Sequence, residues 1–207
     1  DVTSLSEAVS AESKLGIFNT TFGLSVDEYQ CTYTTSGALS LRHTWDILNS
    51  TSGHDHQIYV GNGDSFGVSQ RASAMYNDLP TPELLSLIGL QIETFGNHNF
   101  DNRIDYLQKI IDLSNTAKSG NVLGYHYVAT NLQNAPNLKN WLTHDTVTIP
   151  SSQAGHEGLK VAFIGALDTT VFATTKTGSF GSINIDGQMC SIVNEIELAY
   201  NENARAF

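Results

Sequence analysis

The stretch 92–101, IETFGNHNFD, joins a short apolar run to a polar turn that begins with glycine. Its first part, 92–95, predicts a buried β-strand, and an amphipathic helix is expected from Asp101, which stands where an N-cap residue is favoured. A strand, a polar turn and a helix in this order indicate an α/β layered sheet. In such sheets, binding sites lie beyond the carboxyl ends of the strands, which is where 96–101 falls.

The rest of the chain alternates in the same way. Short apolar runs bounded by polar turns predict further strands at 15–19, 58–60, 127–130 and 161–165. Apolar residues at helical spacing predict helices at 38–48, 83–87, 101–113 and 192–198. Thr81 and Pro82 are typical of an N-cap residue and a first-turn proline. We therefore expect an α/β fold with a layered sheet and flanking helices.

Composition limits the partners and the number of domains. The 207 residues include 10 Lys and Arg against 21 Asp and Glu, a formal net charge of −11. Such a surface repels phosphate backbones, so no nucleic-acid partner is expected. No apolar run reaches the roughly 18–20 residues of a membrane helix, so no membrane span is expected. The length suits one domain at 15–207 behind an irregular segment at 1–14.

The scarcity of Lys and the abundance of Ser, Thr and Asn favour an exported protein, in the periplasm or at a cell surface. Cys31 and Cys190 can form a single disulfide in such a protein or remain two buried thiols. Asn19 and Asn49 each begin an N-glycosylation pattern, which is short and common. The sequence leaves the state of both cysteines and both asparagines open.

Two polar turns carry candidate chemistry. Asp64 follows the predicted strand at 58–60 between glycines, where a carboxylate can bridge cations, although a glycine–aspartate pair also suits a plain turn. Asn97 offers a neutral oxygen ligand, and His98 can donate a proton to a leaving oxygen. Asp101, three residues further on, can orient the His98 imidazole or simply cap the next helix. Spacing alone leaves these alternatives open.

Taken together, the two turns resemble the 5′-nucleotidase branch of the calcineurin-like metallophosphoesterases. Members of that branch carry Gly-Asp-x-Phe and then Gly-Asn-His-Glu-Phe-Asp about thirty residues later, matched here by 63–66 and 96–101. The helix that begins at 37–39, the strand end at 129–132 and the strand at 161–165 resemble further pieces of that domain, in the same order.

The resemblance implies a role for each candidate residue. Asp64 would bridge two divalent metal ions, such as Mn or Zn, and Asn97 would bind one of them. His98, paired with Asp101, would stabilise the phosphoryl transition state. The expected reaction is hydrolysis of nucleoside monophosphates or related phosphoesters.

Departures from the family pattern point to lost or impaired activity. Phe22 and Leu24 stand where the first strand of the family carries its Asp and His ligands. The family's Ser-His and Gly-His-x-His segments, expected after the helix at 192–198, have no counterpart, so the domain is expected to be incomplete. The GHDH stretch at 53–56 is interpreted as a polar turn because it precedes the strand at 58–60.

Two other functions stay open. One is a catalytically inactive structural or binding module of an exported or surface assembly, in which a protein partner covers an open sheet edge. The other is an unrelated α/β domain that carries these motifs by chance. His126, His144 and His156 stand alone in the sequence, and isolated histidines are more often structural or exposed than metal ligands.

Overall fold

A computed structural model describes residues 38–51, 56–67, 71–116, 124–151 and 157–207. Several features named above lie outside these ranges: the segment 1–14, the strand expected at 15–19, Asn19, Phe22, Leu24, Cys31, His54 and His156. Cys190 is described and is an exposed free thiol. The exposed Asn49 lies near the carboxyl end of helix α2 (Ala38–Thr51).

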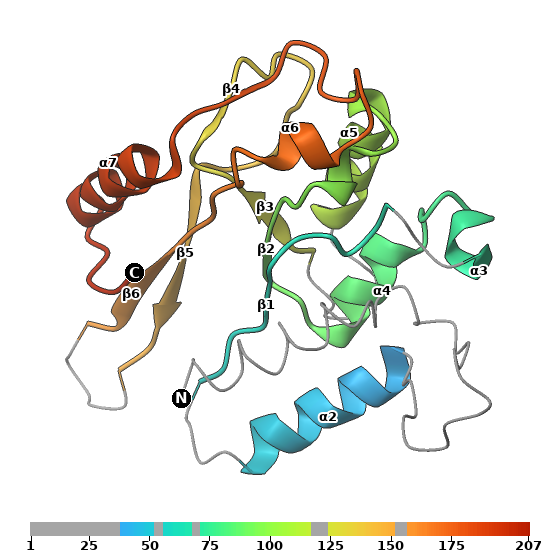
Figure 1. Cartoon of the computed structure of the whole chain (residues 1–207). Coiled ribbons are helices and arrows are strands. Elements are labelled where there is room, and N and C mark those ends of the chain that lie inside the picture. Colours follow the sequence, from blue (N-terminus) through green and yellow to red (C-terminus); the bar gives the residue numbers. More distant parts are fainter. Residues whose placement is uncertain (1–37, 52–55, 68–70, 117–123, 152–156) are drawn as a thin grey trace, which may run out of the picture.

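A parallel three-stranded sheet forms the centre of the fold (Figure 1). Its order is β1 (Val60–Gly61), β2 (Ile92–Thr94) and β3 (His126–Val128), with Ile92 opposite both Val60 and His126. The strands expected at 58–60, 92–95 and 127–130 are therefore confirmed with shifted ends. Parallel neighbours require crossover connections, and helices supply them here.

Three helices lie on one side of this sheet (Figure 1). Helix α2 packs against α4 (Thr81–Ile88), which packs against α5 (Ile104–Ser114). The sheet and these helices bury one large apolar core, whose fully buried members include Leu85, Phe95, Phe100, Leu107, Ile110, Ile111 and Tyr127. The short helix α3 (Arg71–Ala74) precedes α4. The expected layered α/β fold is thus confirmed.

A second unit lies across the sheet from these helices (Figure 1). It is an antiparallel hairpin of β5 (His144–Ile149) and β6 (Leu159–Ile164), packed against α7 (Gln188–Asn201). The strand expected at 161–165 exists as part of β6, and the helix expected at 192–198 is the middle of α7. The sequence analysis missed the partner strand β5, although its residues 146–149 alternate between threonine and apolar β-branched side chains, a pattern typical of a strand.

Shorter elements complete the described chain. Strands β4 (Leu132–Gln133) and β7 (Asn184–Ile185) pair antiparallel, and α6 (Val171–Thr174) lies between β6 and β7 in the sequence. Near the carboxyl end, Ala206 forms a parallel bridge with Val161 of β6.

Two helix starts differ from expectation. Asp101 does not cap α5: it ends the 3₁₀ turn η1 (His98–Phe100), and Arg103 is the residue that precedes α5. The Asp101 carboxylate bonds to the ring of His98 instead. Thr81 is not an N-cap either, because α4 already begins there and Pro80 precedes it.

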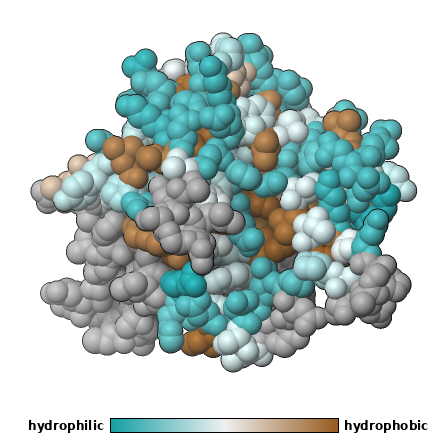
Figure 2. Space-filling model, turned by 180° about the vertical axis from the view of Figure 1, so that it is seen from behind, coloured by the Kyte–Doolittle hydropathy of each residue, from teal (hydrophilic) through white to brown (hydrophobic). Residues whose placement is uncertain are grey.

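Hydrophilic residues cover much of the described surface when the molecule is seen from behind, with hydrophobic residues gathered near the middle of that face (Figure 2). Among the described helices, none is long and apolar enough to cross a membrane.

Candidate functional site

The two polar turns meet at one edge of the parallel sheet. Asp64 lies three residues after β1, and Asn97 lies three residues after β2. Because β1 and β2 are adjacent parallel strands, their carboxyl ends meet at the same edge. The structure therefore brings Asp64 and His98 into contact: the backbone N–H of His98 donates a 2.8 Å hydrogen bond to Asp64 Oδ1.

Glycines make this approach possible. A side chain at Gly96 would collide with the Asp64 carboxylate, and one at Gly63 would collide with the backbone of Gly96. Asp64 itself has a φ of 59°, in the left-handed region that aspartate tolerates better than most residues. Gly63, beside the aspartate, and Gly96, in the other loop, therefore permit the two loops to pack closely.

Asn99 joins the same two loops through its side chain. Its side-chain Oδ1 accepts hydrogen bonds from the backbone N–H groups of Gly96, at 2.7 Å, and Asp64, at 3.1 Å. The residue is fully buried. Sequence reasoning missed Asn99, because an asparagine inside a turn motif gives no sign of which backbone groups its amide will meet.

His98 and Asp101 form a pair within the η1 turn. His98 Nδ1 lies 2.7 Å from Asp101 Oδ2, and the His98 side chain remains 37% exposed. No described residue bonds to the other ring nitrogen, Nε2. A carboxylate on one nitrogen orients the ring, and an accessible second nitrogen can then meet a substrate oxygen.

Asn97, the residue before His98, is tied to the carboxyl end of α6. The Asn97 side-chain Nδ2 lies 3.5 Å from the backbone carbonyl oxygen of Thr174. The backbone carbonyl oxygen of Asn97 accepts a hydrogen bond from the Thr175 hydroxyl at 3.1 Å. No described group donates a hydrogen bond to Asn97 Oδ1. That oxygen is thus available as a ligand.

A second carboxyl group lies close to Asp64. Glu93, on β2, is fully buried, and burial raises its pKa to about 7, while the Ser65 and Tyr127 side chains lower it in part and Asp64 raises it. Burial also raises the pKa of Asp64, and the His98 N–H lowers it in part. Sequence reasoning missed Glu93, although a lone carboxylate inside an apolar strand was a signal that could have found it.

The donors fit a divalent cation only in part. Asp64 Oδ2 and Asn97 Oδ1 are oxygen atoms that no described donor engages, and oxygen ligands suit Mg²⁺ and Mn²⁺. Within the described ranges, however, no cluster of three or more His, Cys, Asp or Glu side chains could hold a metal ion. Two oxygens are too few ligands for a two-metal site.

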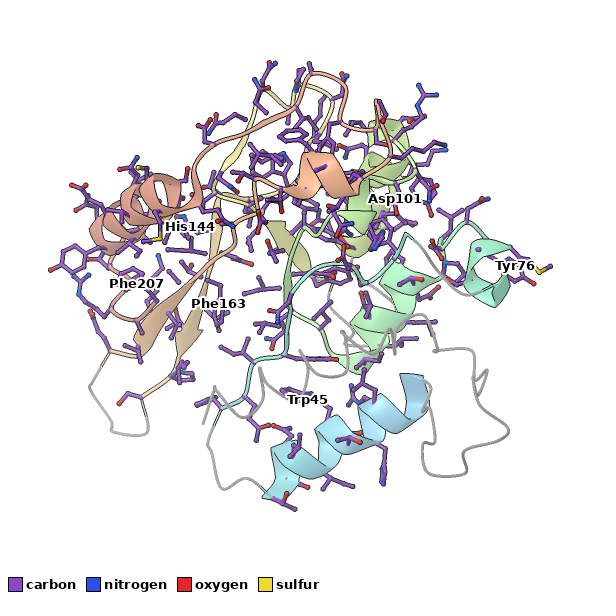
Figure 3. The ribbon with its side chains drawn as sticks, in the orientation of Figure 1. Trp45, Tyr76, Asp101, His144, Phe163 and Phe207 are labelled. Carbon is purple, nitrogen blue, oxygen red and sulfur yellow. The ribbon has the colours of Figure 1, made fainter. Side chains whose placement is uncertain are left out.

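Two other described histidines, His126 and His144, have structural partners. His144 Nδ1 lies 2.6 Å from Glu195 Oε1, which joins the hairpin to α7, and His126 Nδ1 lies 2.7 Å from Asp145 Oδ2. In Figure 3, His144 lies beside α7, well away from Asp101 at the other side of the sheet. The isolated histidines that the structure describes therefore lie outside the candidate site.

No protein-family model matches the chain. Two curated proteins resemble part of it: the cell wall protein Lmo0130 of Listeria monocytogenes, 31% identical over 121 residues, and the endonuclease YhcR of Bacillus subtilis, 33% identical over 116 residues. These matches cover 56% and 54% of this chain but only 15% and 9% of the relatives.

Solved structures match a larger share of the chain than the curated proteins do. A 5′-nucleotidase precursor from Thermus thermophilus matches 81% of this chain with a TM-score of 0.62 and 15% identity. The calcineurin-like phosphoesterase YfkN from Bacillus subtilis matches 86% of this chain with a TM-score of 0.62 and 16% identity. The chain spans 30% and 53% of those two structures. It therefore has the fold of calcineurin-like phosphoesterases and 5′-nucleotidases, and covers only part of such proteins.

Proposed function

We propose that the chain carries part of a 5′-nucleotidase-type, metal-dependent phosphoesterase site, with impaired hydrolysis of nucleoside monophosphates or related phosphoesters. One observation carries the proposal. Asp64 and the His98–Asp101 pair come from turns after two neighbouring strands, and a 2.8 Å hydrogen bond joins Asp64 to the His98 backbone. The phosphoesterase fold of the structural neighbours supports the same assignment.

Each residue has a distinct role in this proposal. Asp64 Oδ2 and Asn97 Oδ1 would hold a divalent cation, Mn²⁺ or Zn²⁺, which when bound supplies charge stabilisation to the phosphoryl oxygens. Asp101 keeps the His98 ring oriented, so that Nε2 faces the ester rather than turning freely. His98 then donates a hydrogen bond or a proton to a phosphoester oxygen as negative charge develops there.

The impairment follows from the small number of ligands. Phe22 and Leu24 offer no donor atoms at the positions where the family carries its first Asp and His ligands. Asp64 and Asn97 together supply a single negative charge and two oxygens. A cation held by so few groups binds weakly, since affinity in oxygen sites rises with the number and charge of the ligands.

The proposal extends to the domain and its location. Residues 15–207 form part of a phosphoesterase domain, and the chain is exported or exposed at a cell surface. The name of the Listeria relative, a cell wall protein, and the precursor form of the Thermus 5′-nucleotidase support export.

The test is a titration of the purified chain with Mn²⁺, followed by calorimetry and by hydrolysis of AMP and p-nitrophenyl phosphate. We expect one weak Mn²⁺ site and slow hydrolysis, both lost in Asp64→Ala. The matched control, Asp105→Ala, removes an exposed carboxylate from α5 and should keep both. Hydrolysis that persists in Asp64→Ala would contradict this assignment.

A second candidate is a structural or binding module without catalysis, which the lack of a metal cluster within the described ranges favours. In that case the same titration gives no Mn²⁺ binding and no hydrolysis in the parent chain. A protein partner at an open sheet edge is then the expected ligand.

A further inference from the structure

We propose that Asn99 is the positioning residue that holds the Asp64 carboxylate at the candidate cation site. The role toward a cation rests on the proposed function, whereas the positioning itself can be measured without metal. The sequence analysis gave Asn99 no role. Its place in the turn motif does not predict that its side chain bonds to the backbone amides of Gly96 and Asp64.

The Asn99 side chain meets both loops at a single atom. Oδ1 accepts the backbone N–H of Gly96 at 2.7 Å and that of Asp64 at 3.1 Å. These two amides belong to the turns after β2 and β1, so one oxygen sets the distance between them. The residue is completely buried, so water cannot take over as acceptor without rearrangement of the loops.

The Asp64 carboxylate depends on that distance. Its Oδ1 accepts the His98 N–H at 2.8 Å, and its carboxylate fills the space next to the Cα of Gly96. If the Asp64 backbone moves away from Gly96, the bond to His98 breaks, because His98 belongs to the other loop. Asp64 also has a positive φ, so the local backbone preference does not by itself keep it in place.

An asparagine suits this position chemically. A carboxylate at this position, like the glutamate of the family pattern, can accept the same bonds but adds a second negative charge beside Asp64. The amide oxygen of Asn99 accepts the same two bonds without charge. Among the described residues, no acceptor bonds to Asn99 Nδ2, so both hydrogen bonds that join the loops use its oxygen.

The test is amide hydrogen exchange measured by NMR on the metal-free chain. Asn99→Ala should accelerate exchange at Asp64 and Gly96, which lose their acceptor, and also at His98, which loses only the positioned carboxylate. We expect an acceleration of at least about tenfold at each amide, as for the loss of one buried hydrogen bond. Asn99→Asp keeps the oxygen and should restore most of the protection.

Asn131 provides a matched control. It is also fully buried, and it bonds the backbone of Leu167 through both Oδ1, at 2.9 Å, and Nδ2, at 2.8 Å. Asn131→Ala should destabilise the fold. The exchange rate of the His98 amide should then rise no more than the loss of global stability accounts for. If Asn99→Ala does not fold, Asn99→Ser, whose side chain is too short to meet both amides, gives the same measurement.

The outcomes separate the two proposals. Unchanged protection of His98 in Asn99→Ala, or equal acceleration in Asn131→Ala, overturns the positioning role. If protection is lost as expected and the parent chain binds Mn²⁺, the variant should bind it at least about tenfold more weakly. If protection is lost but the parent chain binds no Mn²⁺, the positioning role stands and the proposed phosphoesterase function fails.

Discussion

The Asp64 carboxylate lies against the backbone of Gly96, in the space that any side chain at position 96 would need. A Cβ atom there would collide with Asp64 Oδ1, although the two residues are 32 positions apart in the sequence. Close packing of two loops at the end of a parallel sheet therefore requires this glycine. A substitution at Gly96 is therefore expected to affect both the stability of the fold and the position of Asp64 in the candidate site.

Replacing Gly96 with alanine should displace the Asp64 carboxylate and lower the free energy of unfolding by about 1–3 kcal/mol, the usual cost of overpacking. Mn²⁺ binding should weaken in the same variant. Urea unfolding and calorimetry measure the two effects. Gly187→Ala is the control, since a Cβ at Gly187 meets nothing within 4 Å. An unfolding free energy equal to that of the parent would show that Asp64 can move at no cost.

Glu93→Gln should remove a pH dependence of stability. The folded pKa of Glu93, about 7, lies above its ordinary value of 4.5, because burial disfavours the charged form. Between these pH values the folded chain keeps a proton that the unfolded chain has lost. The free energy of unfolding therefore falls as the pH rises from about 4.5 to 7, by about 3 kcal/mol from this group.

The measurement is urea unfolding at pH 4, 6 and 8. The parent and Glu93→Gln should be similar at pH 4, and the variant should be more stable at pH 8. The exposed Glu197 of α7 provides the control, Glu197→Gln, which should follow the parent at each pH. A parallel decline of the parent and Glu93→Gln would place the titrating group elsewhere.

Arg103→Gly should stabilise the protein. Arg103 has φ 73° and ψ 165°, a backbone region that is almost exclusive to glycine and costs other residues about 1–3 kcal/mol. Its side chain is largely exposed, and its ion pair with Asp105 is long, at 3.9 Å. We expect a gain of about 1 kcal/mol in the free energy of unfolding, after the added freedom of glycine in the unfolded chain.

Chemical denaturation of Arg103→Gly and Arg103→Ala separates strain from side-chain effects. Alanine keeps the Cβ atom and should show no such gain. Equal stability of the two variants would mean that the positive φ at this position is not strained.

Asp101→Asn should slow hydrolysis while leaving Mn²⁺ binding unchanged. Asp101 Oδ2 lies 2.7 Å from His98 Nδ1, and a carboxylate can only accept the proton of that nitrogen. An amide can donate or accept, so the His98 tautomer is no longer fixed. We expect a loss of at least about tenfold in kcat. Kinetics with p-nitrophenyl phosphate, together with calorimetry, test this, and Asp105→Asn is the control. A loss of Mn²⁺ binding in Asp101→Asn would show that Asp101 has another role.

Local patterns predicted most of the elements around the sheet. The apolar runs at 58–60 and 92–95 indicated adjacent strands with polar turns behind them, and the helical spacing at 38–48 and 192–198 indicated helices that exist with longer ends. These signals are local, because a strand or helix that buries one face repeats its apolar residues at a fixed spacing along the sequence. The antiparallel hairpin was different: most residues of β5 are half-buried whichever face they lie on, so their burial does not follow the alternation of the strand.

The sequence by itself determined the α/β class and indicated Asp64, Asn97, His98 and Asp101 as candidate site residues, because residue types and their order along the strands are local properties. Only the tertiary structure decided which groups these residues meet. It directed Asp101 to a histidine ring instead of a helix end, buried Glu93 beside Asp64, and placed one Asn99 oxygen between two loops. Such contacts join residues distant in the sequence, and they depend on how the strands pack rather than on any single stretch of chain.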